Sequence, residues 1–155
     1  MALRERLNEA LKDSMLKKDM RAVSTIRMAL AAVKDADIAN RTSESREGIN
    51  DAGVMGVLQG MIKKRRDSIA LYEQGGRKDL AEQEAGEIAV LEKFLPQQMD
   101  QEGMKKAIQA LIAETGTSGI KDMGRVMAEL KTRHAGQMDF GQASGMVKTL
   151  LSGQG

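Results

Sequence analysis

Four consecutive cations, Lys63 to Arg66, are the residues whose chemistry is most suggestive. Basic side chains bind phosphate groups, so such a run could contact RNA. On a helix, however, neighbouring side chains point about 100° apart, so the four diverge. Lys64 and Arg66 would flank the apolar stripe of the helix, and Arg65 would point into it. A solvated helix face is therefore the alternative, and an RNA-binding surface would need further cations. The candidates are Lys64 and Arg66, joined by Lys121, Arg125, Lys131 and Arg133.

The sequence shows no recognisable set of catalytic or metal-binding residues. It contains one histidine, His134, and no cysteine, which excludes disulfides, thiol nucleophiles and cysteine metal sites. Glu82, Glu84 and Glu87 could act as paired carboxylates only if they converge in a pocket. A di-iron site would also need Glu-x-x-His motifs, and these are absent. The sequence contains neither a GxxxxGK[ST] phosphate-binding loop nor a GxGxxG motif after a strand. We expect no catalytic residue, no metal and no cofactor.

Amphipathic segments with helical periodicity must position these side chains. Asp19, Asn50 or Asp51, Asp100 and Asp139 are suited to cap helices, and Gly75-Gly76 is suited to a tight turn. The expected inward residues include Met15 near the end of the first helix and Ile38 near the end of the second. The predicted helices cover residues 2–18, 20–40, 51–73 and 78–94, followed by helices after Asp100, from about Asp122 to His134, and after Asp139.

These segments predict an all-α fold with two helical subdomains. The only proline, Pro96, disfavours helix at Leu95 and marks the boundary between them. Residues 1–95 form a four-helix part and residues 96–155 a three-helix part. Residues 41–50 lose all apolar periodicity, which predicts a mobile surface loop.

One ion pair is expected inside the four-helix part. Arg65 lies in the middle of the apolar stripe of the third helix, and Glu84 lies in the middle of the stripe of the fourth. Because a buried charge is costly unless it is paired, Arg65 should face Glu84 or its neighbour Glu87 across the hairpin. Arg27 is a rival partner. Gly53, Gly56 and Gly60 interrupt the third helix, and close packing of a neighbouring helix would explain them.

The composition limits the classes of partner. The net charge is +2, so nucleic-acid contact would have to come from local patches. Aromatic residues make up 2% of the chain, which argues against binding single strands by base stacking. The 12 methionines are core residues or, alternatively, an exposed docking face for a protein. No apolar run is long enough to span a bilayer, so we expect a cytoplasmic protein without a membrane partner.

Several segments together resemble the YqeY family. They are IRMALAAVKDADI at 26–38, IKKRRDSIALYEQGGRKDLAEQEAGEIAVLEKFLPQQM at 62–99, GTSGIKDMGRVMAEL at 116–130, and the segment from Asp139 to Lys148. The resemblance covers nearly the whole chain and implies an all-α fold of two helical subdomains. It also implies kinship with the C-terminal tail of GatB, a subunit of the glutamine-dependent aminoacyl-tRNA amidotransferase.

In that enzyme the tail engages tRNA, and the carbon-nitrogen ligase chemistry with glutamine as amido-N-donor occurs elsewhere. The resemblance therefore supplies no catalytic residue to this chain. It implies a non-catalytic helical module that binds tRNA or a tRNA-amidating complex. The alternative is a protein–protein interaction adaptor that does not bind nucleic acid.

Overall fold

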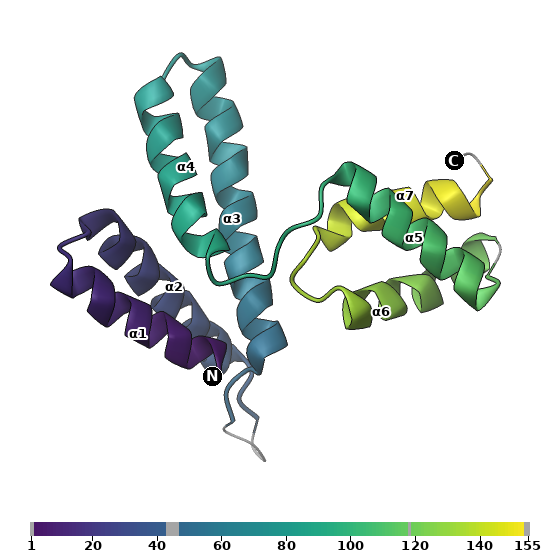
Figure 1. Cartoon of the computed structure of the whole chain (residues 1–155), viewed down its shortest axis with the longest axis horizontal. Helices are drawn as coiled ribbons and strands as arrows, with labels where there is room; N and C mark the ends of the chain where they lie inside the picture. The colour runs from purple at the N-terminus through teal and green to yellow at the C-terminus, as the bar shows by residue number, and fades with distance from the viewer. Residues whose placement is uncertain (1, 43–46, 118, 154–155) are drawn as a thin grey trace. The chain divides into compact units, whose positions relative to one another are not determined.

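The computed structural model describes residues 2–42, 47–117 and 119–153, and these residues form helices without any strand. The all-α prediction is confirmed. The chain divides into two compact units, Met1–Pro96 and Gln97–Gly155. The first unit holds four α-helices and the second holds three (Figure 1), so the predicted grouping is also confirmed. The elements are α1 (Leu3–Leu16), α2 (Met20–Ala39), α3 (Asp51–Gln74), α4 (Lys78–Glu92), α5 (Gln101–Thr115), the 3-10 helix η1 (Ile120–Asp122), α6 (Met123–Arg133) and α7 (Phe140–Leu151).

Short polar side chains begin four of these helices, as the sequence predicts. The Asp19 carboxylate accepts a hydrogen bond from the Ala22 amide at 3.2 Å, and the Asn50 side chain accepts one from Gly53 at 2.9 Å. Asp100 and Asp139 cap α5 and α7 in the same way. Each cap satisfies a backbone amide that would otherwise lack a partner, which is typically worth about 1 kcal/mol.

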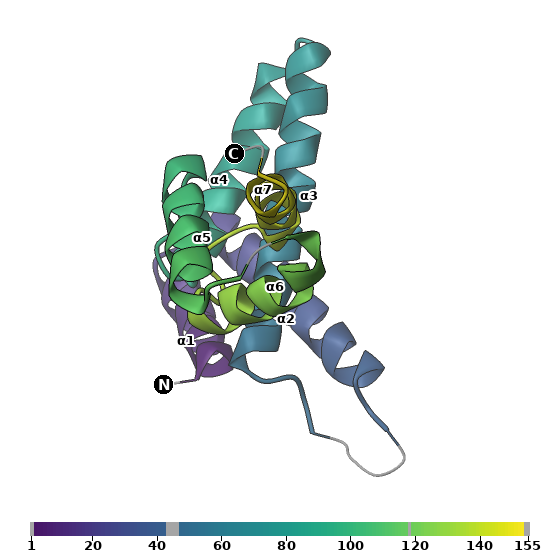
Figure 2. The same cartoon turned by 90° about the vertical axis from the view of Figure 1, so that its right-hand side faces the viewer.

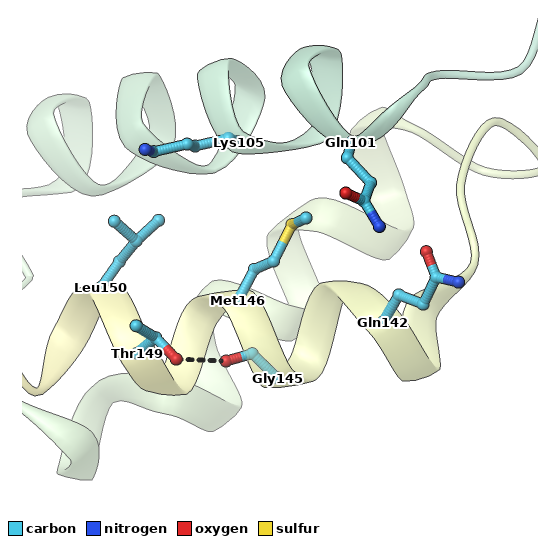
Figure 3. Close-up of a pocket in the computed structure, with 7 residues that line it drawn as sticks. All are labelled: Gln101, Lys105, Gln142, Gly145, Met146, Thr149 and Leu150. Atoms are coloured by element: carbon cyan, nitrogen blue, oxygen red, sulfur yellow. Dashed lines mark hydrogen bonds between the residues drawn. The ribbon is translucent and has the colours of Figure 1, made fainter. Parts of the chain in front are cut away.

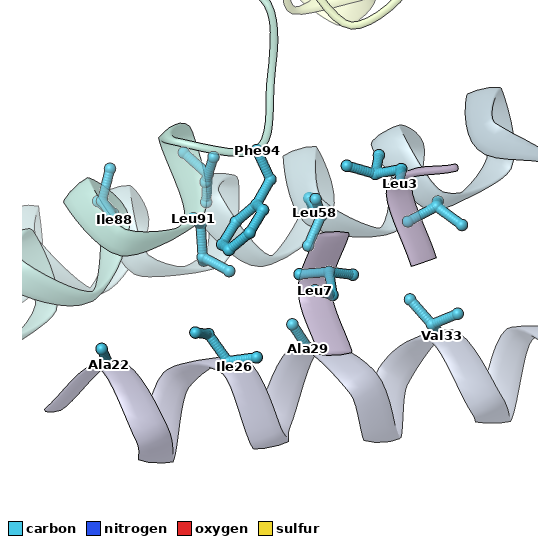
Figure 4. Packing of buried hydrophobic residues seen from close by; sticks show 12 residues of the cluster. Leu3, Leu7, Ala22, Ile26, Ala29, Val33, Leu58, Ile88, Leu91 and Phe94 are labelled. Atoms are coloured by element: carbon cyan, nitrogen blue, oxygen red, sulfur yellow. The ribbon is translucent and has the colours of Figure 1, made fainter. Parts of the chain in front are cut away.

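In the first unit, α1 pairs with α2 and α3 pairs with α4, and the two hairpins enclose one apolar core (Figure 4). Met15 and Ile38 were expected to point inward, and this is wrong, because their residues are 50% and 49% exposed. Both lie in the last turn of their helices, beyond the last buried residues Ser14 and Val33. The core consists of Leu3, Leu7, Ala22, Ile26, Ala29, Val33, Val54, Leu58, Ile62, Ile88, Leu91 and Phe94.

The α3–α4 hairpin is longer than the core that it helps to enclose. The buried side chains of α3 are Val54, Leu58 and Ile62, all in its first half. The far end, around Gly75 and Gly76, extends beyond α1 and α2 (Figures 1 and 2). Leu71 near that end is 67% exposed. The far end therefore depends mainly on contacts between α3 and α4 themselves.

The glycines of α3 do not mark a close helix contact, so that expectation is wrong. A Cβ atom at Gly56 or Gly60 would meet nothing within 4 Å, and the three atoms nearest to one at Gly53 belong to the side chain of Ile49. The close approach occurs instead at Gly86 of α4. There the guanidinium of Arg21 from α2 occupies the space that a Cβ atom would need.

In the second unit, α5, α6 and α7 surround a separate apolar core. The chain entering α5 is fixed to the segment between α6 and α7, because the Met99 amide donates to the Gln137 carbonyl at 2.8 Å. The Gln98 side chain also donates to the Gly136 carbonyl, at 2.5 Å. The buried residues of this core are Met104, Ile108, Leu111, Val126, Leu130, Met138, Ala143, Val147 and Leu151.

One ion pair joins α1, α2 and the end of the predicted loop. Arg4 donates to both carboxylate oxygens of Asp37, at 2.6 and 2.9 Å, and to the Ile49 carbonyl at 2.9 Å. The Ile49 amide donates to Asp37 at 2.8 Å. Residues 43–46 of the predicted mobile loop 41–50 lie outside the described residues. At Ile49, the described end of the segment is held by hydrogen bonds to the helices.

We predict that Asp37 makes the stability of the fold sensitive to acid. The hydrogen bonds from Arg4, followed by the one from the Ile49 amide, hold the pKa of Asp37 below its ordinary value. Stability from a lowered carboxyl pKa is present above the unfolded-state pKa, about 3.9, and is lost as the pH falls through the folded-state value. Asp37→Asn should therefore unfold at a lower urea concentration than the wild type at pH 7. The difference between the two unfolding midpoints should shrink towards pH 3.

The control for this experiment is Asp13→Asn, which removes an exposed carboxylate that pairs with Lys17, four residues further along the chain. Its gap from the wild type should be small at both pH values, because exposed pairs contribute little. A gap for Asp37→Asn that does not change with pH would contradict this role of the carboxylate.

Candidate nucleic-acid interface

All six basic residues predicted to contact RNA are exposed, and they fall into two groups, one on each unit. The first group, on α3, is Lys64 and Arg66. The second group lies on η1 and α6 and consists of Lys121, Arg125, Lys131 and Arg133. Their contact with RNA stays a prediction. The six residues also differ in whether they form ion pairs.

Two of the six already bind carboxylates of the same unit. Arg66 pairs with Glu92 at 3.2 Å. Arg133 donates to both carboxylate oxygens of Glu114, at 2.7 and 3.0 Å, and lies 3.3 Å from Glu129. The fork-shaped contact with Arg133 lowers the pKa of Glu114 and raises the pKa of Arg133. These two cations are therefore less available to phosphate.

The other four cations, Lys64, Lys121, Arg125 and Lys131, form no ion pair with any residue in the described ranges. Lys121 lies in η1, and Arg125 follows it by four residues in the first turn of α6. Lys131 is displaced by about 120° around the α6 axis from Arg125. The opposite side of α6 faces the core, and it carries the buried residues Val126 and Leu130. The exposed side of η1–α6 thus carries unpaired positive charge.

A shallow groove between α5 and α7 is a second surface feature, which the sequence did not predict (Figure 3). It has a volume of about 570 Å³. Met146 and Leu150 form its half-buried apolar floor, and a hydrogen bond from the Thr149 hydroxyl to the Gly145 carbonyl lies at its edge. The polar residues that line it are Gln101, Lys105 and Gln142. The spacing of three and four residues between Gln142, Met146 and Thr149 was the signal that could have revealed it.

None of the residues considered for catalysis lines this groove. His134 follows the last residue of α6 and lies 3.0 Å from the Gln137 side chain. Glu82 is exposed, whereas Glu84 and Glu87 are turned towards Arg65. Within the described parts of the chain, no three His, Asp or Glu side chains are grouped as metal ligands would be. No described helix is both long and apolar enough to cross a membrane.

Arg65 forms the ion pair at the centre of the α3–α4 hairpin. Its Nε donates to Glu87 at 2.8 Å, and its Nη1 donates to the Met61 carbonyl at 3.1 Å. Its Nη2 lies 3.7 Å from the sulfur of Met28 on α2. The sequence pattern favoured Glu84 as the partner, but its nearest oxygen lies 4.0 Å from Arg65 Nε, so the hydrogen bond goes to Glu87. The side chains of Arg65 and Glu87 are 12% and 13% exposed.

Arg27, the rival partner, is exposed and forms no ion pair among the described residues. Its position near the edge of the α2 stripe explains this, because the inward positions of α2 are taken by Val23, Ile26 and Ala29.

We predict that Arg65→Met destabilises the fold by about 1–3 kcal/mol, because it leaves the carboxylate of Glu87 nearly buried without its partner. The matched control is the next residue. Arg66→Met removes an equal charge from an exposed pair and should cost less than about 1 kcal/mol. Chemical unfolding of the three proteins measures both values, and equal, small losses would contradict the assignment.

Comparisons with known proteins identify the family. The family described as YqeY-like protein matches residues 4–151. A relative in Kluyveromyces lactis, named Altered inheritance of mitochondria protein 41, mitochondrial, is 35% identical over 88 residues, which are 57% of this chain and 45% of the relative. The protein of the same name in Vanderwaltozyma polyspora is 29% identical over 124 residues, covering 76% of this chain and 64% of that protein.

An uncharacterized protein of Schizosaccharomyces pombe is 33% identical over 91 residues, or 59% of this chain and 70% of its own length. The matched region spans less than two thirds of the length of the two relatives named for mitochondrial inheritance. The family match, by contrast, covers almost all of this sequence. The chain belongs to the YqeY-like family.

Proposed function

We propose that this chain is a non-catalytic helical module that binds tRNA through phosphate contacts from its second unit. The observation that carries the proposal is the exposed side of η1–α6, where Lys121, Arg125 and Lys131 have no carboxylate partner among the described residues. Cations in this state can replace the counterions of a nucleic acid without first breaking an internal ion pair.

The resemblance of the family to the tRNA-engaging tail of GatB supports the choice of tRNA. The scarcity of aromatic residues favours a folded RNA over a single strand, because base stacking on aromatic rings is the usual means of binding single strands. In this proposal the chain is connected with glutamine-dependent amidotransferases because both bind tRNA. We assign no catalytic residue to the chain.

The test is a titration of tRNA with the purified protein at low and near-physiological salt, with double-stranded DNA as competitor. Binding should prefer tRNA, and the logarithm of the affinity should fall linearly with the logarithm of the salt concentration. Binding that does not respond to salt, or that is equally weak for both nucleic acids, would contradict the proposal.

Charge-neutralising variants identify the surface. The double variant Lys121→Gln/Arg125→Gln should lower the affinity at every salt concentration and reduce the salt slope by about 2, one unit for each lost phosphate contact. The control variant Arg77→Gln/Lys17→Gln removes the same charge from two exposed cations that are paired with Asp79 and Asp13. It should leave the slope nearly unchanged, and equal losses in the two variants would place RNA binding elsewhere.

The groove between α5 and α7 favours a second candidate function, a protein-interaction adaptor. Its floor of Met146 and Leu150 is apolar, and Gly145 beside them is exposed with nothing within 4 Å of an added Cβ. A partner retained after nuclease treatment by the wild type but not by Gly145→Gln would support this function. Gly60→Gln is the control, because Gly60 is also an exposed helical glycine with open space around it. Loss of the partner in both variants would reject the groove.

A further inference from the structure

The turn between α1 and α2 exposes an unusual amount of apolar surface. Met15, Leu16 and Met20 are 50%, 84% and 67% exposed, and they lie within six residues of one another. The other large apolar side chains that are this exposed, among the described residues, are scattered singly along the chain. Single exposed apolar residues are ordinary, but a group indicates a contact surface. We call residues 15–20 the α1–α2 tip.

The backbone of the α1–α2 tip holds a lysine where glycine would be less strained. The Lys18 amide donates to Met15 and the Asp19 amide donates to Ser14, which is the pattern that ends many helices with one left-handed residue. That residue is Lys18, with φ of 58°. Helix α3 ends with the same pattern of hydrogen bonds, but there the left-handed residue is Gly76, with φ of 73°. Because a side chain in this conformation is unfavourable, the lysine has no benefit for the turn itself.

The charges around the α1–α2 tip leave it positive. Four cations, Lys12, Lys17, Lys18 and Arg21, outnumber the two carboxylates of residues 12–21. Of these carboxylates, Asp13 pairs with Lys17 at 3.0 Å, and Asp19 accepts the Ala22 amide at 3.2 Å. Lys12 and Lys18 form no ion pair with the described residues. Lys12 precedes Leu16 by one helical turn and therefore lies on the same side of α1. Exposed apolar side chains thus stand beside unpaired ammonium groups.

We propose that the α1–α2 tip is a contact site for the surface of an anionic lipid bilayer. Leu16, with Met15 and Met20, would enter the boundary between headgroups and acyl chains, while Lys12 and Lys18 bind lipid phosphates. Such a contact needs no membrane-spanning helix, so it differs from the expectation that the chain has no membrane partner. It is also independent of the proposed RNA binding, because it uses other residues.

The size and shape of the site favour a bilayer over a protein groove. The site is the end of a helical hairpin, and it offers three apolar side chains, whereas a stable protein interface takes about 20–30 residues from each side. A bilayer needs no complementary cavity and accepts a few inserted side chains with basic residues around them.

The test is sedimentation of the full chain with vesicles of phosphatidylcholine alone and of phosphatidylcholine mixed with phosphatidylserine. The wild type should bind the anionic vesicles and not the neutral ones. Leu16→Ser should reduce binding by about tenfold, because it removes the most exposed apolar side chain from the inserted group. Leu71→Ser is the matched control, since Leu71 is 67% exposed at the other hairpin, and it should bind as the wild type does.

Lys18→Gly separates binding from folding. It should raise the melting temperature by relieving the left-handed lysine, and it should weaken binding to anionic vesicles by removing a cation. No preference of the wild type for anionic vesicles would overturn the proposal. Full binding by Leu16→Ser, or equal losses in Leu16→Ser and Leu71→Ser, would also overturn it. A lower melting temperature for Lys18→Gly would show that the lysine serves the fold and not the lipid contact.

Discussion

The ion pair between Arg65 and Glu87 is the contact on which the longest hairpin of the protein depends. It lies at the edge of the apolar core of the first unit: Ile62 is the last fully buried residue of α3, and half-buried Ile69 still packs against the core beyond it. Past this pair the two helices have little but each other to pack against. Arg65 also touches Met28 of α2, so the same side chain links the α3–α4 hairpin to the α1–α2 hairpin. A nearly buried charge tolerates little displacement, because any shift that separates it from its partner leaves both groups without compensation. The pair therefore sets the register of α3 against α4.

The same principle divides the positive charges of the chain into two classes. Arginine forms most of the ion pairs among the described residues, as in the contacts of Arg4 with Asp37 and Arg133 with Glu114. Its planar group can bind both oxygens of a carboxylate at once, which suits it to hold elements of a fold together. Lysines such as Lys121 and Lys131 stay without a carboxylate partner in the part of the chain that the structure describes. Ion pairs thus engage only a minority of the cations among the described residues, and most cations there have no carboxylate partner, although the net charge of the chain is only +2.

The helices could be predicted from the sequence because their signals are local. Asp19, Asn50, Asp100 and Asp139 each cap the helix that follows them, within three residues of the amide that they bind. The position of Arg65 in an apolar stripe likewise indicated an internal charge. Its hydrogen-bond partner could have been found from the turn, because Arg65 lies 10 residues before Gly75 and Glu87 lies 11 after Gly76. Glu84 is only 8 residues after Gly76, and its nearest oxygen lies 4.0 Å from Arg65 Nε, farther than that of Glu87.

The features that could not be predicted from the sequence depend on which helices pack against each other. The pairing of Arg133 with Glu114 joins two helices, and neither residue carries a mark of it in the sequence. The glycines of α3 resembled a packing motif, but the close approach occurs at Gly86, where Arg21 of another helix needs the space. Periodicity placed Met15 on the inward side of α1 without showing that the core ends before it.

The most direct test of this account is a double-mutant cycle on the central ion pair, with Arg65→Met, Glu87→Leu and the double variant compared by chemical unfolding. If the pair sets the hairpin, each single variant leaves a nearly buried charge alone, and the double variant removes both charges together. The double variant should then lose less stability than the sum of the single variants, by about 1 kcal/mol or more. Losses that add within about 0.5 kcal/mol would show that the two side chains act independently, and would contradict the account.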